Sequence, residues 1–92
     1  MFIVLVKNKV KLEEKEKYIE VSKKFAQDMK QVNGCLDACV WESKEQSDCV
    51  VNYELWQDEE SYHAQDPQIF LRYKQDLKKG FLGNISETYK IL

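Results

Sequence analysis

The sequence is short of the residues from which most catalytic and metal-binding sites are built. It has a single histidine, His63, together with one proline and three glycines among 92 residues. One histidine excludes a multi-histidine metal site within one chain. A glycine-rich phosphate loop, a cysteine pair at zinc spacing and a nucleophile elbow are also missing. We therefore expect no resident metal, and any chemistry must come from a looser set of side chains.

Neither charge nor hydrophobicity is concentrated in one part of the chain. The 14 basic and 16 acidic side chains nearly cancel and leave a formal net charge of −2, whereas a nucleic-acid-binding protein normally carries a basic face. The opening apolar run from Met1 to Val6 ends at Lys7. It is too short for a membrane span and lacks the flanks of a signal peptide. We expect no nucleic acid or membrane as a partner, and we interpret the run as a buried strand.

The three cysteines, Cys35, Cys39 and Cys49, are an odd number. Cys35 and Cys39 lie four residues apart on a predicted strand, about 13 Å at the usual rise, which is too far for a disulfide. Free thiols are typical of a reducing compartment. The pattern predicts a cytoplasmic protein without disulfides.

Length and composition predict one globular domain over residues 1–92. Apolar residues make up 43% and aromatic residues 12% of the sequence, which is ordinary for a folded domain. No repeat, low-complexity tract or linker interrupts it. A chain of this size buries only about 60–65% of its unfolded surface, so a second copy would help to complete the core.

Hydrophobic periodicity predicts four strands and two helical regions. Residues at intervals of three and four, including Tyr18, Phe25 and Met29, form one stripe of a long helix. Asn33-Gly34 supplies its stop. The predicted elements are a strand at 2–10, a helix at 12–32, hairpin strands at 35–43 and 49–57, a short helix from 58 to about 66, a helix from 67 to 80, an apolar loop at 81–83 and a last strand at 84–92.

This order predicts an α+β, ferredoxin-like βαββαβ domain. Its four-stranded antiparallel sheet would carry both helices on one face. Several strands are apolar on both sides, so the face without helices also needs a cover. A second copy of the sheet is the economical one, and we expect a homodimer through that face.

Asn8 is the most informative residue of the pattern. It is the only polar member of a strand face that also carries Phe2, Val4, Val6 and Val10. A buried amide that lacks a partner costs about 1–3 kcal/mol. Asn8 is therefore either a structural amide bonded to nearby backbone or an amide aimed into a pocket to hold a substrate oxygen, and the pattern leaves both open.

Other candidate residues follow the second strand of the hairpin. Trp56 is either a core aromatic or the wall of a pocket that offers its indole N–H to a ligand; its strand face also carries Asn52 and Glu54, so that face is not a uniform core. His63, on the short helix, is either a solvated surface group or a proton acceptor, because histidine titrates near neutral pH. Glu54 is a second candidate base. Phe70 reads most simply as core.

Three parts of the sequence resemble one known family. They are Asn8 in the first strand, the Asn33-Gly34-Cys35 junction and above all the segment Tyr53-Glu54-Leu55-Trp56-Gln57-Asp58-Glu59-Glu60-Ser61-Tyr62. The chain is similar, over nearly its whole length, to the antibiotic biosynthesis monooxygenase family. In members of this family a strand typically ends with glutamate, an apolar residue and tryptophan, and an aspartate then begins a helix. A histidine and a proline follow before a helix rich in aromatic residues.

The resemblance implies a dimeric α/β barrel and cofactor-independent oxygenation of a small polyphenolic or quinol-type molecule. Asn8 and Trp56 match pocket positions, and with Phe70 they are the predicted substrate-binding residues. His63 would be the catalytic proton acceptor. A substrate that becomes an electron-rich anion can pass an electron to O2 itself, so the protein need only deprotonate it, hold it and exclude water.

Two other functions remain open on the same scaffold. One is a non-catalytic small-molecule-binding or stress-response dimer. The other is heme binding or degradation, but the heme-degrading branch of the superfamily has a histidine in the second helix, and the chain has none around Tyr73 and Lys74.

Overall fold

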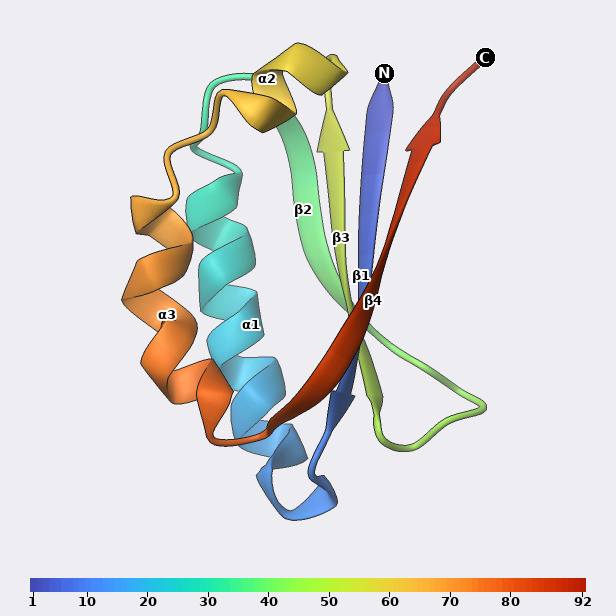
Figure 1. Ribbon diagram of the computed structural model, residues 1–92, viewed down its shortest axis with the longest axis vertical. Coiled ribbons are helices and arrows are strands. Elements are labelled where there is room, and N and C mark those ends of the chain that lie inside the picture. The colour runs from blue at the N-terminus through green and yellow to red at the C-terminus, as the bar shows by residue number, and fades with distance from the viewer.

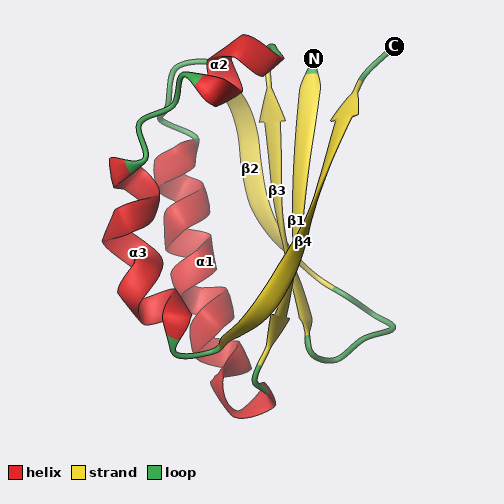
Figure 2. Cartoon of the chain, viewed as in Figure 1, coloured by secondary structure: helices red, strands yellow, loops and turns green.

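The computed structural model describes residues 1–92 and has the predicted βαββαβ order (Figures 1 and 2). A single 3₁₀ turn, Leu12–Glu14, precedes the first helix. The elements are β1 (Phe2–Val10), α1 (Lys15–Met29), β2 (Cys35–Glu42), β3 (Cys49–Trp56), α2 (Glu59–His63), α3 (Gln68–Lys78) and β4 (Phe81–Lys90).

The four strands form one antiparallel sheet in the order β2-β3-β1-β4. Figure 1 shows α1 and α3 side by side over one face of this sheet, with α2 at one end. The ferredoxin-like fold predicted from the sequence is therefore confirmed. The register places Asn8 of β1 opposite Val50 of β3 and Asn84 of β4. The buried Asn8 amide therefore has an apolar neighbour on one side and a polar neighbour on the other.

The core lies between the sheet and the helices in two clusters of buried side chains. Trp56 and Met29 belong to the cluster near α2, while Val10 and Val50 belong to the cluster at the other end. The inward stripe of α1 is the predicted one, and its buried members are Tyr18, Val21, Ser22, Ala26 and Met29.

The connection from α1 to β2 fixes the position of α2. The helix ends at Met29, three residues before the predicted end, and Gly34 follows with a φ of +90° that favours glycine. A Cβ on Gly34 would lie 2.5 Å from Cβ of Ser61. Asp58 caps α2 as predicted, because its Oδ1 accepts a hydrogen bond of 2.7 Å from the Ser61 N–H. The Gly34 turn thus lies directly against Ser61 of α2, and this contact holds α2 at the end of the sheet.

The prediction of an apolar loop at 81–83 is wrong. Phe81 pairs with Val10 and Gly83 with Lys9, so β4 begins at Phe81, and it ends at Lys90 rather than at residue 92. Leu82 is the extra residue of a β-bulge between these pairs. A bulge with glycine beside it has the composition of a loop, which explains the error.

The face of the sheet without helices remains apolar and open. Trp41 stacks on Tyr53, with ring centroids 4.8 Å apart, and both Ile85 and Tyr89 are exposed. All three cysteines are free thiols. None of the helices has the length and hydropathy needed to cross a bilayer.

Candidate functional site

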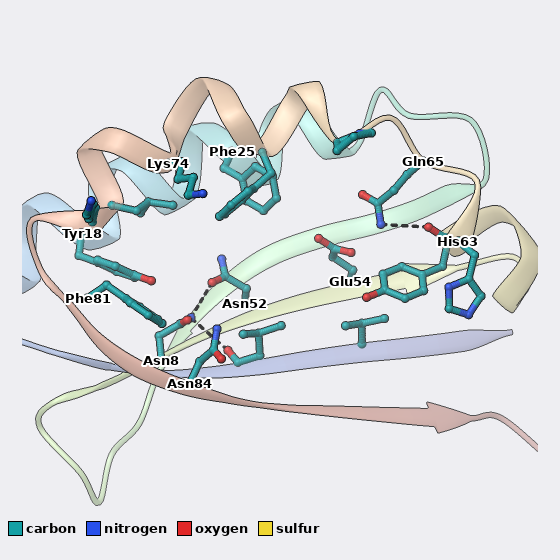
Figure 3. Close-up of a pocket in the computed structure, with 17 residues that line it drawn as sticks. Asn8, Tyr18, Phe25, Asn52, Glu54, His63, Gln65, Lys74, Phe81 and Asn84 are labelled. Atoms are coloured by element: carbon teal, nitrogen blue, oxygen red, sulfur yellow. Dashed lines mark hydrogen bonds between the residues drawn. The ribbon is translucent and has the colours of Figure 1, made fainter.

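A cavity of about 800 Å³ lies between the sheet and its helices and opens to solvent (Figure 3). Both sheet and helices contribute to its wall. The strands supply Val4, Val6, Asn8, Asn52, Glu54, Phe81 and Asn84; the helices and the α2–α3 link supply Tyr18, Phe25, Tyr62, His63, Gln65, Pro67, Phe70, Lys74, Leu77 and Lys78.

Three amides lie together on the sheet side of this cavity, one from each of β1, β3 and β4. The Asn8 amide is 3% exposed, and its Nδ2 donates to Oδ1 of Asn52 at 2.8 Å and to the Val50 carbonyl at 3.1 Å. Asn52 Nδ2 points away from this bond, toward the helices (Figure 3). The side chain of Asn84 makes no hydrogen bond within the chain and lies beside Asn8 (Figure 3). Asn8 is thus both a structural amide and part of the cavity wall.

A carboxyl group projects from the same side of the sheet toward the helices. It is that of Glu54, and its Oε1 accepts a hydrogen bond of 2.9 Å from the indole N–H of Trp56. Burial raises the pKa of Glu54, and the indole hydrogen bond only partly opposes this rise. The Glu54 carboxyl is therefore biased toward its protonated form.

His63 lies at the α2 end of the cavity (Figure 3). Its side chain is 65% exposed, and Nε2 lies 3.1 Å from Oε2 of Glu59, one turn earlier on α2. The imidazole can therefore exchange protons with solvent while it borders the cavity. This placement suits a group at the mouth rather than one enclosed with a ligand.

Aromatic side chains line the helix side of the cavity, and two lysines of α3 also line it. Phe70 packs edge-on against Phe25 of α1, with ring centroids 5.8 Å apart. Lys74 and Lys78 follow on α3, and neither forms an ion pair within the chain. An aromatic wall opposite a few fixed polar groups is the usual construction of a site for a small organic ligand.

The structure brings Asn8, His63 and Phe70 to one cavity, but it places Trp56 behind the wall. Trp56 is fully buried and is not among the lining residues. The sequence left Trp56 as either a core aromatic or a pocket wall, and the family resemblance implied that it binds substrate; in the fold its indole N–H donates to Glu54. Trp56 therefore holds Glu54, which lines the cavity, and does not line the cavity itself.

Sequence reasoning did not find Asn84 or the two lysines of α3. Asn84 joins the site only through the β1–β4 register, which pairs it with Asn8. Lys74 and Lys78 are one helical turn apart and lack carboxylate partners. The only sequence signal for this part of the site was two lysines four residues apart on a helix without carboxylates to neutralise them, and such a spacing is common on helix surfaces.

Solved structures confirm the fold. A conserved protein of unknown function from Bacteroides thetaiotaomicron has a TM-score of 0.85 at 22% identity, covering 98% of this chain and 96% of its own. A conserved protein from Methanosarcina mazei has a TM-score of 0.82 at 22% identity, covering 97% and 90%. A Nitrosomonas europaea protein named for the antibiotic biosynthesis monooxygenases has a TM-score of 0.87 at 16% identity, covering 100% and 99%.

None of the curated proteins compared with this chain matches it. The sequence profile of one family does match, and it covers residues 1–67, from β1 to the proline that precedes α3. That span includes Asn8, Glu54, Trp56 and His63. The chain belongs to the antibiotic biosynthesis monooxygenase family.

Proposed function

We propose that this protein is a cofactor-independent monooxygenase that oxidises a small aromatic or quinol-type molecule with O2. The observation that carries the proposal is the cavity of about 800 Å³, which joins an aromatic wall to three amides and one partly buried carboxyl group. Such a lining would hold a planar ring by its faces and its oxygen atoms by hydrogen bonds. Family membership adds support for oxygenase chemistry.

The proposed reaction needs deprotonation and protection from water. A quinol-type substrate would lose a hydroxyl proton, and the resulting anion would reduce O2; one oxygen atom enters the product and the other leaves as water. Asn52 Nδ2 would donate to the substrate oxygen, while Asn8 holds Asn52 in place through the 2.8 Å bond. His63 is the proposed proton acceptor on the solvent side of the site, and Phe70 is the proposed cover of the ring.

Oxygen uptake with 1,4-dihydroxynaphthalene as the probe tests this proposal. We expect uptake by the wild-type protein, and a lower rate with the fold retained in His63→Ala. Lys44→Ala, in the β2–β3 turn away from the cavity, is the matched control. Binding of the probe without oxygen consumption would instead support a non-catalytic binding protein, and a Soret band on titration with heme would redirect the proposal to heme.

We also propose that the protein is a homodimer through the open face of the sheet, with the thiols kept reduced in the cytoplasm. The apolar groups on that face include Trp41, Tyr53, Ile85 and Tyr89, and helices already cover the opposite face. Sedimentation equilibrium tests this: Ile85→Lys should weaken the dimer. A charge at Leu71, which is exposed on α3, should leave the dimer intact.

A further inference from the structure

Glu54 has a carboxyl group where the fold provides little to stabilise a charge. On β3 it lies opposite two buried apolar residues, Val4 of β1 and Ala38 of β2. Its side chain points to the helix-covered side of the sheet (Figure 3). A solvated surface carboxylate would need the other face, so the position calls for a different explanation.

The carboxyl group has one partner and no counter-ion. No lysine, arginine or histidine pairs with Glu54; its only hydrogen bond comes from the Trp56 indole N–H to Oε1. Trp56 is itself fixed, because it is fully buried and packs edge-on against Tyr62 with ring centroids 5.7 Å apart. Oε2 accepts no hydrogen bond within the chain and remains available to a molecule in the cavity.

The competing explanation is that Glu54 only satisfies the buried indole N–H. A neutral acceptor such as a glutamine carbonyl would do this without desolvating an ionisable group, which is costly. The free oxygen on the cavity side has no use in that explanation. The desolvated carboxyl group and its free Oε2 atom both favour a role in which Glu54 takes up and releases a proton.

We propose that Glu54, positioned by the Trp56 indole, is the group inside the cavity that takes the hydroxyl proton of a phenol- or quinol-type ligand. This inference rests on the proposed function. In the step, the substrate O–H bond breaks and its electron pair stays on the substrate oxygen, while a new O–H bond forms on Glu54. Glu54 returns this proton to the oxygen atom that leaves as water, and the second proton of the water comes from the ring carbon that gains the other oxygen atom, so the carboxylate is regenerated. In this assignment Glu54 replaces His63 as the first acceptor of the hydroxyl proton, and the exposed His63 exchanges protons with solvent at the mouth.

The surroundings set the pH at which Glu54 is a base. Burial and the nearby charge of Glu54 raise the pKa of Tyr62 and of Cys35, the latter to about 11, so both are neutral near pH 7. The deprotonated, active form of Glu54 therefore accumulates above its own raised pKa. The other titratable groups of the cavity are Tyr18 of α1, His63 of α2, and Lys74 and Lys78 of α3.

Two variants separate the base from the structural acceptor. Glu54→Gln keeps an oxygen for the indole and removes the base; kcat for 1,4-dihydroxynaphthalene should fall about a hundredfold or more, with KM little changed. Trp56→Phe keeps the base and removes its hydrogen bond. Because that bond lowers the pKa of Glu54, the inflection of kcat/KM against pH should move to higher pH. Wild-type kcat in Glu54→Gln would overturn the inference, whether or not Trp56→Phe folds.

A second measurement does not depend on turnover. Infrared difference spectra of wild type against Glu54→Gln isolate the Glu54 carboxyl band, and its titration should have a midpoint above the usual glutamate range. Binding of 2-naphthol, which we use as a non-turnover phenol, should perturb that band. If the protein proves not to be an oxygenase, this result still supports a proton-accepting Glu54; a band that titrates normally and ignores 2-naphthol would refute it.

Discussion

The hydrogen bond between the two amides of β1 and β3 allows a quantitative test of how the site is held. Asn8→Leu removes the bond to Asn52 and leaves the buried Val50 carbonyl without its side-chain donor. One lost hydrogen bond costs about 1 kcal/mol and a partly unsatisfied buried carbonyl at least as much again, which gives about 2–3 kcal/mol. A 92-residue domain is stable by about 5–14 kcal/mol in total, so the loss is readily measured.

The double mutant isolates the pair. Asn52→Leu leaves Asn8 its two backbone acceptors, the Val6 and Val50 carbonyls at 3.2 and 3.1 Å, so it should cost only about 1 kcal/mol. In the double variant no amide is left half-paired. Its destabilisation should therefore be about 1 kcal/mol less than the sum of the two single effects.

Equilibrium urea unfolding at one fixed protein concentration measures all four forms, since a dimer would make stability concentration-dependent. Asn84→Leu is the matched control, because Asn84 lies opposite Asn8 and its side chain makes no hydrogen bond, and this substitution should be near neutral. Single effects that add within about 0.3–0.5 kcal/mol would show that the two amides are not coupled. That result would refute the proposal that Asn8 holds Asn52 in place.

Two further predictions concern the frame of the site. Gly34→Ala should destabilise the protein by more than about 1 kcal/mol, because the new Cβ meets Ser61 at 2.5 Å at a φ of +90°. Gly83→Ala, with φ +149° but no atom within 4 Å of its Cβ, is the control and should cost less; equal losses in urea unfolding would contradict the contact. Ser22→Ala should raise the thermal midpoint, because Ser22 Oγ is buried without a partner, and an unchanged or lower midpoint would indicate a bound water there.

Sequence periodicity predicted the elements because each strand and helix has its own apolar face. It could not predict long-range register, and the site depends on register. Asn84 reaches Asn8 only after β4 pairs with β1 through a bulge at Leu82. Trp56 and Glu54 were placed on one strand face correctly. Which of them lines the cavity depends on where α2 packs, since the ring of Tyr62 covers the indole.

The raised pKa of Glu54 also predicts how stability changes with pH. When the folded state raises the pKa of an acid, it binds the proton more tightly than the unfolded chain does. The stabilising contribution is therefore complete below the unfolded pKa of about 4.5 and is lost as the pH rises through the folded pKa. Glu54→Gln stays uncharged. It should gain stability relative to wild type as the pH rises through this window, even though it loses the proposed base.

A surface carboxylate on the other face of the sheet provides a control of opposite sign. The ion pair with Lys7 at 3.1 Å lowers the pKa of Glu87, so its contribution is present above the unfolded pKa and is lost as the pH falls through the folded one. Glu87→Gln should accordingly lose stability relative to wild type near neutral pH. Urea midpoints of the three proteins from about pH 4 to about pH 8 measure both trends. A difference between Glu54→Gln and wild type that stays flat with pH would mean that the fold leaves this carboxyl group as acidic as in water, and a base poised by burial would then have no physical support.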